Sequence, residues 1–186
     1  EMERETGGRG RSASGRRGAP EPRTNADGAR WEKQAANVTS VRGDWGISQN
    51  HGKTDADAVF GMIYAQSEDD FKRVETNYIN AMGRLAEAEG ESAIYRDLRM
   101  KLFIDPDTLK AQYAATPERL KPRMVAWADG LTFHMDKHPS VAPRVIPRFE
   151  PWLALASTVG DSAGNIGEVP TPAPQSFHAS RSGHPS

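Results

Sequence analysis

Apolar side chains recur three and four positions apart between residues 54 and 105, which is the period of helices with one buried face. Thr54, followed by Asp57, predicts the start of a first helix, and Ser67, followed by acidic residues, predicts the start of a second. We expect the second helix to end at Gly90 and a third to end before Pro106. The apolar residues of these helices are Val59, Phe60, Ile63 and Tyr64, then Phe71, Val74, Tyr78, Met82 and Leu85, and then Ile94, Leu98 and Leu102.

The helical period continues after Pro106. Residues 109–115 predict a short fourth helix, and Thr116 predicts the cap of a fifth, with Pro117 in its first turn and a bend at Pro122. Prolines after residue 138 end the pattern, so residues 141–149 predict an extended segment and residues 152–156 the start of a last helix or strand. Strand character is otherwise confined to residues 38–47. The buried side of the fifth helix consists of Leu120, Met124, Trp127, Leu131 and Met135.

Composition divides the chain into three parts. Residues 1–36 are rich in arginine and glycine, and residues 161–186 are rich in proline and serine, so we predict that both are disordered tails. Residues 37–160 predict one domain, mainly α with an early strand. Its five apolar stripes exceed the needs of one small core, and we therefore expect some of them to face a partner.

The overall charge and the absence of cysteine narrow the possible functions. A net charge of -1 provides no field that would attract nucleic acid or an acidic membrane. The arginine-glycine runs resemble RNA-binding segments, but acidic residues dilute them and no aromatic residue precedes Trp31, which indicates a solvated tail. Without cysteine the chain forms no disulfide and no thiolate metal site. No apolar run approaches the ~20 residues of a membrane helix, and no signal peptide is visible, so the compartment stays open.

Several short motifs occur in an order that resembles the α chain of the penicillin amidase (penicillin acylase) family. They are Trp45-Gly46-Ile47, Gly61-Met62-Ile63-Tyr64-Ala65-Gln66, Asp69-Asp70, Gly83-Arg84-Leu85-Ala86-Glu87 and Arg148-Phe149-Glu150-Pro151-Trp152. The resemblance covers residues 41–155. It implies a largely helical chain that lends an early strand to a four-layer αββα sandwich, formed with a larger β chain of the same precursor. Relatives are commonly periplasmic or secreted.

The resemblance also implies a reaction. Members of the family hydrolyse the amide bond of acylated amines, such as β-lactam, acyl-homoserine lactone or acyl-peptide substrates, through the N-terminal serine of the β chain. The α chain shapes the acyl pocket, so we expect this chain alone to be inactive. No cofactor is implied, but a structural calcium ion is. Glu168 is the glutamate nearest to the place where relatives carry a calcium ligand.

The sequence departs from the family pattern at two places. Ser48-Gln49-Asn50 follows the Trp-Gly turn where relatives have Pro-His-Ile or a close variant. The resemblance also fades after Leu155, near the start of the proline- and serine-rich tail. A truncated or frameshifted gene product would show this pattern.

Two local motifs suggest other chemistry. Gly160-Asp161-Ser162-Ala163-Gly164 fits the Gly-x-Ser-x-Gly turn of serine hydrolases, but the residues after it make a poor helix start. His134 and His138 lie four residues apart, as paired zinc ligands do, yet no third ligand follows, and a packing role at a helix end is favoured.

The tryptophans and the acidic runs have simpler interpretations. Trp45, Trp127 and Trp152 are predicted to anchor a core or an interface. The acidic runs at residues 68–70 and 87–91 indicate a helix start and a solvated face. A second interpretation of the whole chain stays open: a non-catalytic helical protein that binds a partner through its unused apolar faces, aided by the arginine-rich tail.

Overall fold

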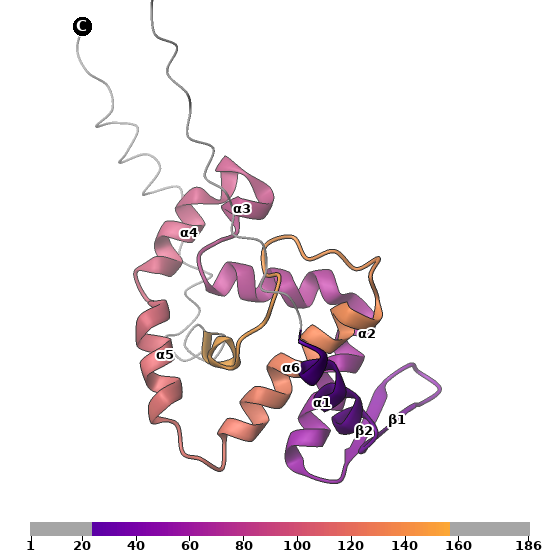
Figure 1. Cartoon of the computed structure of the whole chain (residues 1–186). Coiled ribbons are helices and arrows are strands. Elements are labelled where there is room, and N and C mark those ends of the chain that lie inside the picture. Colours follow the sequence, from indigo (N-terminus) through magenta and orange to yellow (C-terminus); the bar gives the residue numbers. More distant parts are fainter. Residues whose placement is uncertain (1–23, 157–186) are drawn as a thin grey trace, which may run out of the picture.

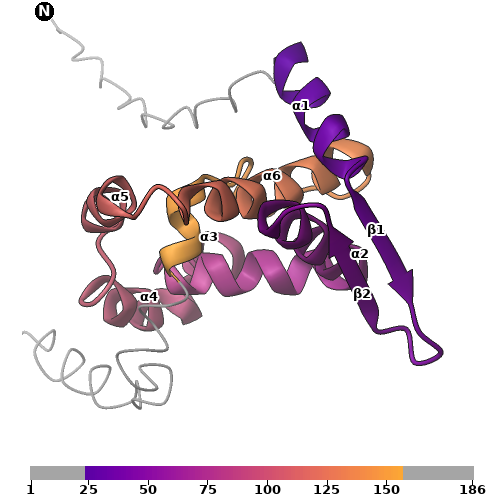
Figure 2. The same ribbon diagram turned by 90° about the horizontal axis from the view of Figure 1, so that it is seen from below.

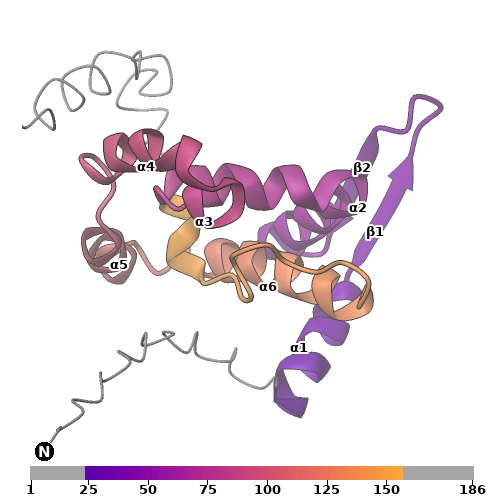
Figure 3. The ribbon, with the colours of Figure 1, turned by 90° about the horizontal axis from the view of Figure 1, so that it is seen from above.

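The computed structural model describes residues 24–156, which form six helices and one hairpin within that range (Figure 1). Helices α2 and α6 run side by side through the middle, with α4 and α5 at one end and α1 and the hairpin at the other (Figures 2 and 3). The helices are α1 (Asn25–Ala35), α2 (Asp55–Ala81), α3 (Ala86–Glu89), α4 (Ile94–Lys101), α5 (Pro106–Ala115) and α6 (Lys121–Lys137); the strands are β1 (Val38–Arg42) and β2 (Ser48–Gly52); and the 3-10 turns are η1 (Glu91–Ala93) and η2 (Pro151–Leu153). The prediction of a mainly helical chain with an early strand is confirmed for this range.

Helix α2 unites the first two predicted helices. Thr54 and Asp57 form a reciprocal capping box at its start, as predicted. The backbone is non-helical at Asp70 (φ -161°, ψ 76°), whose carboxylate accepts a 3.0 Å bond from the Arg73 N–H and so caps the second half. The predicted end at Gly90 is wrong, because Gly83 takes a left-handed conformation (φ 61°) and turns the chain seven residues earlier.

Three local predictions need correction. Thr116 ends α5 instead of starting the next helix, and Pro122 lies in the first turn of α6, where a missing N–H breaks no bond. The strand predicted over residues 38–47 is β1 plus its turn, and it pairs antiparallel with the unpredicted β2, Val38 facing Gly52. Residues 141–149, for which we predicted an extended segment, form a loop without helix or strand.

The predicted disordered tail at residues 1–36 is too long, since residues 25–35 form helix α1. Thr24 caps this helix, and Trp31, which is 1% exposed, anchors it. The indole ring packs against Phe133 with ring centroids 6.2 Å apart. The sequence did not predict this helix because the segment contains few apolar residues. A single buried tryptophan is enough to hold the helix against the core. The rest of both predicted tails lies outside the described residues.

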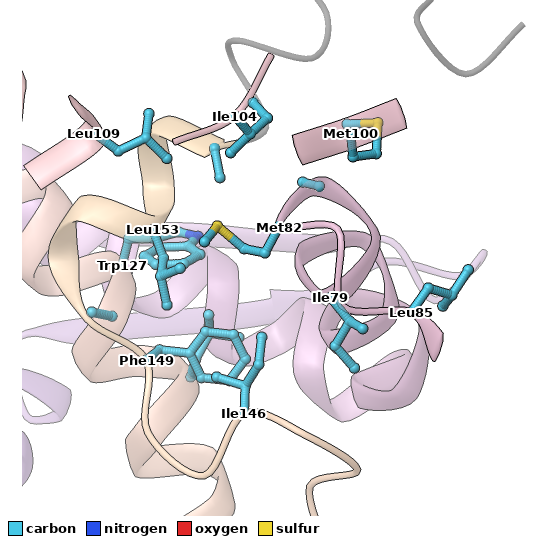
Figure 4. Close-up of a cluster of buried hydrophobic side chains, with 14 of the residues drawn as sticks. Ile79, Met82, Leu85, Met100, Ile104, Leu109, Trp127, Ile146, Phe149 and Leu153 are labelled. Atoms are coloured by element: carbon cyan, nitrogen blue, oxygen red, sulfur yellow. The ribbon is translucent and has the colours of Figure 1, made fainter. Parts of the chain in front are cut away.

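The main core joins α2, α4, α5, α6 and the segment after α6 (Figure 4). Trp127 lies near its centre, with its ring 4.8 Å from Tyr78 and 5.8 Å from Phe149. Helices α2 and α6 approach so closely that a Cβ at Gly130 would lie 2.5 Å from the Ile63 side chain and 2.9 Å from the Phe60 carbonyl oxygen. The close helix pair therefore requires a glycine at this position. The labelled core residues are Ile79, Met82, Leu85, Met100, Ile104, Leu109, Trp127, Ile146, Phe149 and Leu153.

Candidate functional site

The α4 surface, defined as Ile94, Leu98, Leu102 and Phe103, is an apolar stripe that faces outward. These side chains are 41%, 52%, 80% and 52% exposed. Met100, on the opposite side of the helix, enters the core. The third predicted stripe is therefore not the buried side of α4, and exposed apolar groups in contiguous patches mark contact surfaces.

The tip of the hairpin exposes a second apolar group. Trp45 is 92% exposed and Ile47 is 70% exposed. Arg42 holds the turn, because its guanidinium donates a 2.9 Å bond to the Gly46 carbonyl and pairs with Asp69 at 2.7 Å. Trp45 is thus presented outward on an ordered turn, so of its two predicted roles the structure excludes the core and leaves the interface.

The hairpin turn and α4 lie at opposite ends of the molecule, and both lie on one side of α2. In Figures 2 and 3 both lie beyond α2, on the side away from α1. The large apolar residues that are exposed within residues 24–156 come from the hairpin, α2, α4 and the turn after α4. The hairpin tip and the α4 surface are therefore two separate apolar surfaces for a partner.

A cavity of about 710 Å³ opens between α1, α6 and the segment that follows α6. Apolar groups and three arginines line it, namely Arg30, Arg84 and Arg148, together with the carboxylates of Asp129 and Glu150. The motif Arg148-Phe149-Glu150-Pro151-Trp152 forms one wall. Phe149 is buried in the core behind this wall, while Trp152 is half-buried.

Glu75 holds the beginning of that wall in place. Its carboxylate is fully buried and accepts backbone N–H bonds of 2.9 Å from Arg144, Val145 and Ile146. Both carboxylate oxygens take part, one with two donors. Because backbone N–H groups solvate a carboxylate well, the buried charge ties the end of the 141–146 loop to the second half of α2.

Two further buried carboxylates hold neighbouring segments. Asp97 accepts bonds from the Leu85 and Ala86 N–H groups at 2.8 and 2.7 Å and so fixes the turn after α2. Asp129 accepts a 2.9 Å bond from the Trp31 indole and binds the Arg30 guanidinium. This hydrogen bond from Arg30 to Asp129 is the main cause that raises the pKa of Arg30. The walls of the cavity are therefore positioned by acids that sequence analysis did not identify.

The sequence carries a signal for one of these acids. Glu75 lies on the apolar stripe of its helix, where a solvated carboxylate is out of place, whereas Asp129 lies on the side of α6 opposite the stripe of Trp127 and Leu131. A buried acid needs donors, but the donors here come from segments far away in the sequence. The pattern could therefore have identified Glu75, but neither Asp129 nor the partners of the two acids.

The other predicted site residues have different outcomes. Ser162 and Glu168 lie outside the described residues. His134 and His138 do come together, with ring centroids 4.4 Å apart, but within residues 24–156 no three histidine or acidic side chains form a metal-binding group. His134 is 3% exposed and stacks on Phe71, which agrees with the predicted packing role. None of the helices in residues 24–156 is long and apolar enough to cross a membrane.

Comparison with known proteins gives a family and a fold. The family model described as penicillin amidase matches residues 37–165. The match continues past Leu155, where we expected the resemblance to fade, and Ser162 lies within it. A solved structure of thermostable penicillin G acylase from Alcaligenes faecalis is similar over 72% of this chain and 75% of that chain, with a TM-score of 0.59 and 17% identity. At this identity the likeness shows the fold alone. No curated protein sequence matches the chain.

Proposed function

The chain belongs to the penicillin amidase family of hydrolases, and we propose that it is the α chain of an enzyme that cleaves the amide bond of acylated amines. The family match over residues 37–165 carries this proposal. The substrates we propose are of the β-lactam, acyl-homoserine lactone or acyl-peptide type.

The catalytic group in this proposal is the N-terminal serine of a separate β chain. Its α-amino group, with a pKa of about 8, takes the hydroxyl proton, and the serine oxygen attacks the amide carbonyl. The C–N bond then breaks, the amine leaves with the proton, and water hydrolyses the acyl-enzyme. Donors on the β chain stabilise the oxyanion. This chain supplies none of these groups, so we expect it to be inactive alone.

The β chain is the partner that best fits the exposed apolar side of this chain. We propose that the β1–β2 hairpin joins the β-chain sheet, as an αββα sandwich requires, and that Trp45 inserts into the β chain. A two-stranded hairpin is marginal on its own in water, and pairing with a larger sheet would stabilise it. The α4 surface would be covered in the same assembly. We assign no calcium ligand within residues 24–156, because no suitable group of three occurs there.

The contribution of this chain to the reaction is the shape of the acyl pocket. The wall held by Glu75 carries Arg148-Phe149-Glu150-Pro151-Trp152 and leads directly to the part of the chain that the resemblance assigns to that pocket. We propose that the 146–153 segment sets the direction of this continuation. Its displacement would then alter the preference for the acyl group.

A comparison of two preparations tests the proposal. The native complex, captured with an antibody against this chain, is assayed with a panel of chromogenic acyl amides that differ in the acyl group. The same panel is applied to this chain produced alone. We expect hydrolysis by the complex and none by the single chain. An inert complex over the whole panel would reject the enzymatic function.

The second interpretation is a non-catalytic protein that binds a partner, and the exposed α4 surface and hairpin tip are the observations in its favour. It predicts a stable complex whose partner lacks an N-terminal serine and which does not hydrolyse acyl amides. Salt-sensitive binding of RNA by the whole chain would assign the arginine-rich tail to this second function.

A further inference from the structure

His134 lies in an aromatic stack where helix α6 ends against helix α2. Its ring is stacked on Phe71, with centroids 5.7 Å apart and 21° between the planes, and lies edge-on to Tyr64 at 5.4 Å. The ring of His138 also lies beside the His134 ring, with centroids 4.4 Å apart. The stack therefore contains two imidazoles and two aromatic rings from two helices.

The Nδ1 side of the His134 imidazole offers no acceptor to a proton. Its Nδ1 atom is buried and has no hydrogen-bond partner within residues 24–156. The His134 carbonyl oxygen, in contrast, has two: it lies 2.9 Å from the His138 ring Nδ1 and 3.0 Å from its backbone nitrogen. His138 thus closes the last turn of α6 over His134, and a proton on the buried ring would add charge to a site built for a neutral one.

The stack lies on the break in α2. Asp70, whose backbone is non-helical, directly precedes Phe71, so the two halves of α2 meet where His134 packs. A cavity of about 480 Å³ lies beside the stack, lined also by Ser140 and Val141 of the loop that continues toward Glu75's donors. Release of the stack would therefore loosen both the break in α2 and the loop after α6.

The charges around the stack do not compensate a proton on His134. Burial, and then His138, lower the pKa of His134, while Glu68 opposes them. Glu68 itself is paired with Arg42 at 3.2 Å. The titratable and charged groups that face the stack are Tyr64, Glu68, Asp69, Asp70 and Lys72 from α2, Lys137 and His138 from α6 and its end, Arg42 from the hairpin, and Glu32 from α1, which pairs with Lys137.

We propose that His134 and His138 form an acid-sensitive latch that holds the end of α6 against the break in α2, and that protonation of His134 opens it. The closed state is fully favoured above the ordinary pKa of histidine, 6.5, where His134 is neutral whether the latch is open or closed. Below this pH the open state binds a proton that the closed state does not. The population of the closed state therefore decreases as the pH falls toward the lowered pKa of the His134 ring in the folded chain.

Hydrogen exchange of the whole chain between pH 8 and pH 5 tests the latch, with each amide rate corrected for its intrinsic pH dependence. In the window below pH 6.5 a single linked proton raises the opening constant about tenfold per pH unit. We expect this loss of protection at the end of α6 and around residue 71, and not in α5. Protection that is independent of pH at these amides would overturn the proposal.

Three variants identify the responsible ring. His134→Phe keeps a ring on Phe71 but cannot titrate, so its protection should not change with pH; acid opening as in the parent would refute the role of His134. His138→Asn removes the ring that closes the last turn of α6 and should raise the opening constant already at pH 8, while an unchanged opening constant at that pH would exclude His138 from the latch. His51→Gln, at an exposed position on β2, is the matched control and should open like the parent.

Discussion

Replacement of Glu75 by leucine is the most informative perturbation of this fold. The carboxylate is fully buried, no cation within residues 24–156 forms an ion pair with it, and three backbone amides donate to it at 2.9 Å. Leucine has a similar volume but accepts no hydrogen bond, so three amides would lose their acceptor, one at the buried Ile146 and two at partly buried positions. Each unpaired amide costs about 1–3 kcal/mol, and removal of the buried charge offsets part of this sum. We expect Glu75→Leu to lower the free energy of unfolding by about 3–5 kcal/mol.

Glutamine at the same position gives an intermediate case. Its carbonyl oxygen can replace Oε1 and keep the bonds from Val145 and Ile146, but its amino group then faces the Arg144 N–H, which is also a donor. One unpaired amide and the loss of charge predict a cost of about 2 kcal/mol. A free energy of unfolding that rises from the leucine variant to the glutamine variant to the parent would show that Glu75 holds the loop through its acceptor oxygens.

Urea unfolding of the full chain measures these costs, and the denaturant slope should stay constant across the series. The matched control is Glu89→Gln, since Glu89 is exposed and its carboxylate lies 3.8 Å from the same arginine, Arg144; we expect a change below about 0.5 kcal/mol. If burial of the charge outweighed its hydrogen bonds, Glu75→Leu would be neutral or stabilising by about 1–4 kcal/mol. That result would refute the reasoning.

Three other predictions follow from the contacts. Asp97→Asn should lower the free energy of unfolding by about 1–3 kcal/mol in urea, because one of two buried amides loses its acceptor; an unchanged value would show that the turn after α2 needs no anchor. Gly130→Ala should cost about 1–3 kcal/mol by overpacking against α2, whereas Gly28→Ala, with no atom within 4 Å of its Cβ, should stabilise α1 slightly in the same assay; equal effects would contradict the close helix contact. Trp45→Ser should leave the unfolding of this chain unchanged within about 0.5 kcal/mol but weaken β-chain binding at least tenfold by titration, and equal binding would remove the hairpin from the interface.

The helical part of the fold was predictable because capping and periodicity are local. The Thr54 box could be identified from a few residues, and the structure has it. The second predicted cap, Ser67, is wrong: its hydroxyl donates a 2.8 Å bond to the Ile63 carbonyl inside α2, and Asp70 is the residue that caps the second half. The break inside α2 and the early turn at Gly83 were harder, since a stripe of apolar residues continues across them to Leu85. Leu85 is indeed buried, but it enters the core from a separate turn that Asp97 fixes.

The long-range features were not predictable from the sequence. Trp31 secures α1 through Phe133 and Asp129, about a hundred residues away, so the local composition suggested a tail. The same limit applies to the candidate site, because the donors to Glu75 belong to the segment that follows α6 in the sequence. The expectation that some apolar stripes face outward is met by the α4 surface. The sequence alone did not show which stripe this would be, and the structure identifies it through the exposed Leu98 and Leu102.

The proposal that this chain is half of an enzyme is tested most directly by the composition of the native complex. The chain is purified under non-denaturing conditions from the cells that make it, and the intact masses and N-terminal residues of its partners are determined. The account predicts a larger second chain in a 1:1 complex, with serine as its first residue. Recovery of this chain alone, or with a partner that begins with another residue, would contradict it.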